Sequence, residues 1–366
     1  MIHSTDIHSG GPPSNFMNYK FEDRPFLVFW EVTRACALAC SHCRAEAQPC
    51  RDPDELDKEE AIKLVEDLAE LRPPMLILTG GDPLMRPEVL DIARHATSLG
   101  LHVGLSPSGT NRLVNADFQA FRDAGIQRMS LSLDGATRET HDAFRGIEGT
   151  FDRTIKAIHM ANEVGLSLQI NTTLTAGNMH EFHAFRDLMF ELKPAMWSVF
   201  IIVPMGRAGM DDLPDPDALE RIFEEMSDLV GDAPFSIKTT EGHHFRRVMI
   251  QRGKGGQRKK MGMHSPLGVR DGRGVMFISH TGEVSPSGFM PIVCGNVRDE
   301  HPADIYRKNP LFVSLRDNDA LKGKCGQCEF RQVCGGSRSR AWAATGDPLA
   351  ADPLCPYLPE AATLTL

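Results

Sequence analysis

The sequence lacks the features that would place it across a membrane. No stretch of its 366 residues approaches about 18 consecutive apolar residues, the length that a spanning helix needs. The opening MIHSTDIHSGGPPSNFMNYK has no basic start, no apolar core and no small-residue cleavage site, so it does not resemble a secretory signal. We therefore expect a cytoplasmic protein with no membrane span.

Positive charge is also scarce. The 40 Lys and Arg residues are outnumbered by 49 Asp and Glu residues, and the formal net charge is -9. Proteins that bind nucleic acid carry the opposite balance, because they must neutralise phosphates. The composition therefore argues against a nucleic-acid partner, although one short run, RGKGGQRKK at 252–260, is locally basic.

The cysteines do not suit a disulfide framework. There are nine, an odd number, and most of them are bunched. In a reducing compartment such bunches indicate metal or cluster ligation rather than disulfides. The first group is Cys36, Cys40 and Cys43, the second is Cys325, Cys328, Cys334 and Cys355, and Cys50 and Cys294 stand apart.

Short β-rich runs alternate with amphipathic helical stretches through the first two thirds of the chain. The runs lie at 26–31, 75–78, 101–105, 128–133, 166–171 and 197–202. Helical patterns begin near Asp57, where Glu60 completes a capping box, and recur near 87–98, 115–124, 150–163, 179–191 and 217–230. Six strand-helix units in series predict an α/β fold with a parallel sheet, either doubly wound or an incomplete barrel, with its functional loops at the carboxyl ends of the strands.

The alternation of strand and helix patterns ends after the basic run at 252–260. The stretch GRGVMFISHTGEVSPSGF predicts a β-hairpin with its turn at Thr281-Gly282, and the chain then becomes rich in Cys, Gly and Arg. We expect a flexible segment at 1–25, a barrel domain at 26–250, a basic linker loop at 251–269 and a small cysteine-rich α+β domain at 270–366.

Cys36, Cys40 and Cys43 follow the first predicted strand with the spacing C-x3-C-x2-C. Three thiolates on one loop can hold three irons of a four-iron, four-sulfur (4Fe-4S) cluster and leave the fourth iron open to a ligand. A structural zinc site is the alternative, but zinc loops usually come as C-x2-C pairs with a fourth ligand nearby. The spacing favours the cluster.

The second predicted strand ends in TGGDP. Paired glycines at Gly80 and Gly81 allow close backbone approach to a ligand, and Asp82 can accept a hydrogen bond from an ammonium group. Alone, the motif is also typical of an ordinary tight turn.

C-x3-C-x2-C followed by GGDP and SLDG resembles the radical S-adenosylmethionine (SAM) superfamily, over residues 26 to about 240. The resemblance implies a partial (β/α)6 barrel. It also implies an enzyme in which the open iron binds SAM and an electron cleaves SAM to methionine and a 5'-deoxyadenosyl radical, which takes hydrogen from the substrate. The electron would come from a reductant such as flavodoxin or ferredoxin.

The same resemblance assigns roles around SAM. Gly80, Gly81 and Asp82 would contact its methionyl amino group. Ser132, with Ser108 and Arg145, would face its carboxylate and ribose, since charge-assisted hydrogen bonds are strong. The alternative for Arg145 is a surface ion pair with Asp142 or Glu148.

The C-terminal motif resembles the SPASM/twitch extension of radical SAM enzymes. The resemblance implies an auxiliary 4Fe-4S cluster on Cys325, Cys328, Cys334 and Cys355, with zinc as the competing metal. A second auxiliary cluster often uses cysteines where this chain has Arg338 and Ser287. We therefore expect one auxiliary cluster, with Cys294 either spare or a ligand in an unusual site.

Stretches spread over most of the chain, such as SLDGATRETHDAFRG and FISHTGEVSPSGF, resemble the SAM-dependent heme synthase branch, which oxidatively decarboxylates the propionates of iron-coproporphyrin. A porphyrin substrate would want cationic partners, and His244 is a candidate ligand of its iron. Two alternatives remain: a maturase of a ribosomally made peptide, although only 25 residues precede the first strand, and a non-enzymatic zinc-stabilised binding protein. The candidate cations are Arg207, Arg246, Arg247, Arg338 and Arg340.

Overall fold

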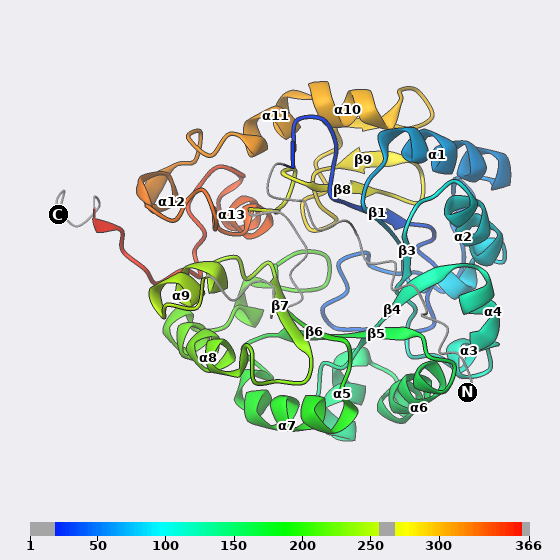
Figure 1. The fold of residues 1–366 in the computed structure, drawn as a ribbon, viewed down its shortest axis with the longest axis horizontal. Helices are drawn as coiled ribbons and strands as arrows, with labels where there is room; N and C mark the ends of the chain where they lie inside the picture. Colours follow the sequence, from blue (N-terminus) through cyan, green and yellow to red (C-terminus); the bar gives the residue numbers. More distant parts are fainter. Residues whose placement is uncertain (1–18, 256–267, 361–366) are drawn as a thin grey trace, which may run out of the picture.

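The computed structural model describes residues 19–255 and 268–360, and ten strands form one continuous sheet in the order β10-β9-β8-β1-β2-β3-β4-β5-β6-β7. The strands run in a curve with the helices outside it (Figure 1). Their bounds are β1 (Leu27–Glu31), β2 (Met75–Thr79), β3 (Val103–Leu105), β4 (Ile126–Ser132), β5 (Ser167–Leu174), β6 (Met196–Ile201), β7 (Ser236–Thr240), β8 (Val275–Ile278), β9 (Glu283–Ser285) and β10 (Gly295–Asn296).

Strands β1 to β7 pair in parallel, each with the next along the chain. Their apolar character is typical of strands buried on both faces: every residue of β3 is buried, as is nearly all of β6. The six predicted strands are confirmed, and β7 is an addition to them. Because the sheet ends at β7 and β10 without closing, the predicted partial barrel is confirmed.

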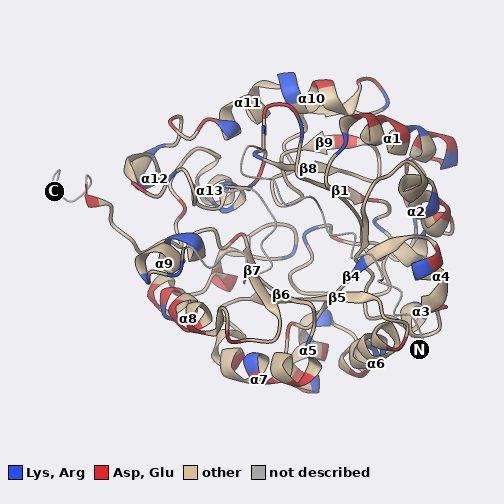
Figure 2. Ribbon diagram, in the orientation of Figure 1, with Lys and Arg blue, Asp and Glu red and all other residues tan. Residues whose placement is uncertain are grey.

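Helices follow the strands on the outer side (Figure 1). The predicted capping box is confirmed, because Asp57 caps α1 and Glu60 bonds back to its amide. Charged residues lie mainly on these outer helices, while the strands carry few (Figure 2). The helices are α1 (Lys58–Leu71), α2 (Val89–Ser98), α3 (Asn111–Val114), α4 (Phe118–Asp123), α5 (Arg138–Arg145), α6 (Thr150–Glu163), α7 (Phe182–Leu192), α8 (Pro216–Leu229), α9 (Phe245–Gln251), α10 (Pro302–Lys308), α11 (Pro310–Arg316), α12 (Gly323–Gln327) and α13 (Arg338–Thr345). None of the helices in the described chain is long and apolar enough to cross a bilayer.

The C-terminal part of the chain extends the same sheet. β8 pairs in parallel with β1, and β8 and β9 form the predicted antiparallel hairpin. Most of the predicted N-terminal segment and linker, at 1–18 and 256–267, lies outside the described residues. The domain boundaries stay a prediction.

The C-terminal part contains a buried ion pair whose arginine also bonds to the barrel. Arg340 and Asp352 are both 0% exposed, and Arg340 Nη2 lies 2.8 Å from Asp352 Oδ2. The same guanidinium donates to the carbonyl oxygens of Ile202, just after β6, and Glu241, just after β7. Although burial opposes it, the positive charge of Arg340 lowers the pKa of Asp352.

We expect Arg340→Met to lower the free energy of unfolding by about 3–5 kcal/mol, because it leaves the Asp352 carboxylate buried without its cation. Anaerobic urea unfolding followed by circular dichroism measures the loss. The control is Lys308→Met, which removes an exposed pair with Asp304 on α10 and should cost less than about 1 kcal/mol. Equal losses in the two variants would contradict the prediction.

Candidate active site

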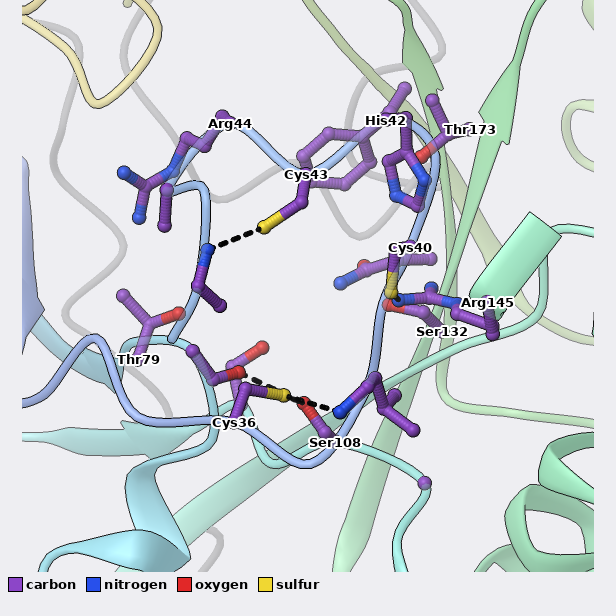
Figure 3. Close-up of a pocket in the computed structure, with 18 of the residues that line it drawn as sticks. Cys36, Cys40, His42, Cys43, Arg44, Thr79, Ser108, Ser132, Arg145 and Thr173 are labelled. Atoms are coloured by element: carbon purple, nitrogen blue, oxygen red, sulfur yellow. Dashed lines mark hydrogen bonds between the residues drawn. The ribbon is translucent and has the colours of Figure 1, made fainter. Parts of the chain in front are cut away.

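A cavity lies at the carboxyl ends of the parallel strands. Its empty volume is about 1170 Å³, which includes the solvent space at its mouth. The loop after β1, blue and central in Figure 1, contributes the three cysteines. Residues at the ends of β2, β3, β4, β5 and β6 form much of the wall around them. Of the predicted site residues, the following line the cavity: Cys36, Cys40, Cys43, Gly80, Gly81, Ser108, Ser132 and Arg145 (Figure 3).

Hydrogen-bond donors point at the sulfurs. The amide of Leu38 donates to Cys36 Sγ (3.4 Å) and the amide of Ala47 donates to Cys43 Sγ (3.4 Å), as dashed in Figure 3. The Ser108 hydroxyl lies 3.7 Å from Cys36 Sγ. Burial raises the pKa of the Cys36 thiol, and the Leu38 amide and the Ser108 hydroxyl oppose that rise. They would stabilise thiolates that ligate a metal.

The two glycines after β2 let this turn pack directly on the cysteine loop. A Cβ at Gly80 would lie 2.4 Å from the carbonyl oxygen of Thr33, and one at Gly81 would lie 2.6 Å from that of Ala35. Amides of the turn bond to the same loop, Gly81 to Thr33 (2.8 Å) and Asp82 to Ala35 (2.7 Å). The glycines are therefore needed for backbone contact within the protein as well as for the cavity wall.

Asp82 does not line the cavity. Its side chain is 0% exposed, and its carboxylate accepts hydrogen bonds from the Thr110 hydroxyl (3.0 Å) and from the amides of Leu84 (3.2 Å) and Ser108 (3.4 Å). Burial raises the pKa of this carboxyl group, although the donors oppose the rise. In this structure Asp82 holds the turn and the start of the next loop instead of facing a ligand.

Arg145 pairs with a buried acid and not with the surface acids Asp142 or Glu148. It forms an ion pair with Asp134, and its Nη1 lies 3.7 Å from Cys40 Sγ. Although burial opposes it, Arg145 lowers the pKa of Asp134. Asp142 accepts backbone amides at the start of α6 instead. Arg145 is therefore fixed beside a cysteine of the loop.

Several wall residues were outside the predicted set. His42 lies 4.2 Å from the Phe144 ring, between ring centroids, and burial lowers its pKa to about 4, so it is neutral at pH 7. Arg44 directly follows Cys43, the last cysteine of the motif, so its position next to the motif is the sequence signal that could have identified it. Thr173 and Phe289 come from β5 and from the C-terminal part, where no local sequence signal connects them to the site.

The four C-terminal cysteines also come together. The amide of Asp352 donates to Cys325 Sγ and that of Gly336 donates to Cys334 Sγ, both at 3.4 Å. Burial raises the pKa of the Cys334 thiol to about 12. A second, smaller pocket is lined by Cys325, Cys328, Cys334 and Cys355 together with Arg247.

The remaining two cysteines line neither pocket. Cys294 donates to the Ile292 carbonyl (3.5 Å), and burial raises its pKa to about 11. Cys50 is exposed. Ser287, which stands where a second auxiliary cluster often has cysteine, is buried and accepts from the Phe289 amide (3.2 Å).

The arginines proposed from the sequence to face a porphyrin do not line the cavity. Each of them bonds inside the protein; Arg207, for example, donates to the carbonyls of Cys40 and Ala47. His244 is 0% exposed against Phe223 and is not on the wall either. The set comprises Arg207, Arg246, Arg247, Arg338 and Arg340.

The donor set fits an iron-sulfur cluster better than a single ion. Within 19–255 and 268–360, no group of three or more His, Cys, Asp or Glu residues could hold one metal ion. Zinc draws its ligands around one point, whereas a four-iron cluster takes its thiolates at separate corners. The three cysteines, spread around one cavity with donors at their sulfurs, suit the second arrangement.

An open parallel barrel, with three cysteines after its first strand and a glycine turn after its second, defines the class of radical SAM enzymes. The Radical SAM superfamily model matches residues 30–189. The AdoMet-dependent heme synthase of Oleidesulfovibrio alaskensis is 39% identical over 341 residues, 91% of this chain and 88% of that protein. The AdoMet-dependent heme synthase of Methanosarcina barkeri is 39% identical over 345 residues, 92% and 97% of the two chains.

This chain therefore belongs to the radical SAM superfamily. It is an enzyme whose cofactors are SAM and a 4Fe-4S cluster. Its fold is that of Streptococcus suis SuiB bound to S-adenosylmethionine, with a TM-score of 0.68 and 17% identity over 92% of this chain and 78% of SuiB.

We expect Gly81→Ala to lower 5'-deoxyadenosine formation roughly 100-fold and to reduce iron content, because the new Cβ would push the cysteine loop out of register with the turn. Iron analysis and chromatography of the product measure both. Gly209→Ala is the matched control, since nothing lies within 4 Å of a Cβ there. If the two variants behaved alike, the packing argument would be wrong.

Proposed function

We propose that this enzyme oxidatively decarboxylates propionate side chains of an iron-porphyrin. The observation that carries the proposal is the 39% identity to AdoMet-dependent heme synthases over about nine tenths of the chain. The cavity agrees with it, since Arg44 and Arg145 are among the described residues of its wall and Asp and Glu are not. Such a wall suits a substrate with several carboxylates.

In this proposal Cys36, Cys40 and Cys43 ligate the cluster whose open iron binds SAM. When bound, the cluster and SAM would supply the radical chemistry that removes a hydrogen atom from a propionate. Gly80 and Gly81 form the part of the cavity wall, beside the cysteine loop, that the methionyl group would face.

Polar wall residues orient SAM in the proposal. Ser108, Ser132 and Arg145 face its carboxylate and ribose, and Arg145 is held for this by Asp134. Asp82 acts indirectly, because it does not line the cavity. Its carboxylate accepts a hydrogen bond from the amide of Ser108 and so fixes the backbone of that wall residue.

Loss of a hydrogen atom and of carbon dioxide from a propionate leaves one electron to be removed before the vinyl group is complete. We assign Cys325, Cys328, Cys334 and Cys355 as the residues that would hold an auxiliary cluster, which would supply an acceptor for this electron or a support for the substrate. A cytoplasmic flavodoxin or ferredoxin would supply the electron that starts each cycle.

The test is anaerobic reconstitution with iron and sulfide, followed by incubation with SAM, reductant and iron-coproporphyrin III. We expect absorbance near 400 nm with roughly seven or eight irons per chain, deoxyadenosine, and a porphyrin that has lost carbon dioxide and two hydrogens per reacted propionate. SAM cleavage with an unchanged porphyrin would exclude this substrate. Colourless protein with stoichiometric zinc would favour the zinc-stabilised binding protein.

A peptide substrate is the second candidate. SuiB bound to its precursor peptide SuiA shares this fold with a TM-score of 0.69, but at 17% identity the likeness shows the fold alone. The porphyrin assay separates the two candidates, because a peptide maturase would leave iron-coproporphyrin intact.

We expect Cys40→Ala to reduce deoxyadenosine formation to background, because a cluster that lacks a ligand cannot present its open iron. The matched control is Cys50→Ala, which removes an exposed thiol that lines neither pocket and should cleave SAM at the wild-type rate. Wild-type cleavage by Cys40→Ala would overturn the catalytic assignment.

Cys328→Ala should separate the two activities. We expect porphyrin decarboxylation to be lost while part of the SAM cleavage survives, because the auxiliary cluster acts after the radical forms. Cys294→Ala, outside both pockets, should retain both activities. Complete and equal loss of both activities in folded Cys328→Ala protein would argue against this division of labour.

A further inference from the structure

Among the described residues two arginines line the cavity, and the structure gives them different surroundings. Arg145 is occupied by Asp134 on one side and Cys40 on the other. Arg44 lies across the cysteine loop from that pair, beyond Cys43 (Figure 3). Its side chain is 20% exposed, so part of it reaches open space.

Arg44 rests on a surface built by the C-terminal part of the chain. Its Cζ lies 4.5 Å from the centroid of the Phe277 ring in β8, which is cation-π geometry. Gly288 lies against the guanidinium as well, since a Cβ there would be 3.0 Å from Arg44 Cζ and Nε and 2.9 Å from Phe277. The ring of Phe277 and the backbone at Gly288 therefore fix the plane of the Arg44 guanidinium.

One nitrogen of the guanidinium forms an ion pair with a buried acid. Arg44 Nη1 lies 3.0 Å from Glu31 Oε2, and His280 Nδ1 lies 2.9 Å from Glu31 Oε1. In the described part of the chain Glu31 is the acid that pairs with Arg44. A guanidinium has five N–H donors in a rigid fork, so pairing of one nitrogen with one carboxylate leaves donors for a second one.

We propose that Arg44 binds a carboxylate of the substrate, and that Phe277, Gly288 and Glu31 position it for this task. The inference rests on the proposed function, because it takes the substrate to be a porphyrin that carries propionates. It adds a specificity residue that belongs to neither the cysteine set nor the SAM contacts. It also gives the C-terminal part a role in substrate recognition, through the residues that support Arg44.

The experiment measures binding of iron-coproporphyrin III to the cluster-loaded enzyme by absorbance titration, in parallel with the same porphyrin after conversion of its propionates to primary amides. We expect Arg44→Gln to weaken binding of the carboxylate form roughly 10- to 100-fold, the value of a charge-assisted contact, and to leave binding of the amide form unchanged. Arg44→Lys should recover part of the loss, because it keeps the charge without the fork.

A double-variant cycle tests the positioning claim. Gly288→Ala should weaken binding of the carboxylate form by displacing the guanidinium, and the double variant should bind no more weakly than Arg44→Gln alone. Losses that multiply would show that Gly288 acts by another route. Arg138→Gln is the control, because Arg138 is an exposed arginine, paired with Asp152, that does not line the cavity.

The outcomes separate this inference from the proposed function. If the wild-type enzyme binds neither porphyrin, the proposed substrate and the role of Arg44 both fall. If the wild type binds and Arg44→Gln binds equally well, the porphyrin assignment stands and Arg44 is not its anchor. Equal losses for the carboxylate and amide forms would make Arg44 a structural residue and overturn the inference.

Discussion

The site depends on direct packing of one backbone segment on another. The turn after β2 has no side chain at Gly80 or Gly81, and the carbonyls of the cysteine loop occupy the space where two Cβ atoms would be. Hydrogen bonds from the turn to Thr33 and Ala35 then set the height of the loop above the sheet. This contact fixes the start of the loop just before Cys36, and Arg207 holds the carbonyls of Cys40 and Ala47 further along, because the loop between β1 and α1 has no regular secondary structure of its own.

The sequence predicts most of the barrel because its strands are buried and apolar. Strands β1 to β6 are therefore recognisable in the sequence as short hydrophobic runs bounded by polar residues. β7, with the sequence SIKTT, carries one large apolar residue, Ile237, and lacks that signal. The pairing of β8 with β1 joins residues about 250 positions apart, for example Trp30 with Ile278. Local periodicity carries no information about such a pairing.

The same distinction holds at the site. The cysteine motif and the glycine turn are local patterns, and they locate the cavity correctly. The direction in which a side chain points is not local: Asp82 turns inward because Thr110 and two amides take its oxygens, and Arg44 reaches the cavity because Phe277 and Gly288 support it. Apart from the amide of Leu84, these partners lie in other parts of the chain, so the sequence alone could not reveal either orientation.

The parallel pairing of β8 with β1 has a consequence for how this protein can be divided. In a chain that stopped after β7, one side of β1 would expose a row of unpaired N–H and C=O groups, which is a template for joining another molecule. A fragment made of the catalytic barrel alone would therefore self-associate through this edge. The cysteine-rich extension therefore also covers the edge of β1 through β8. A shortened form of the protein would need another segment to cover that edge.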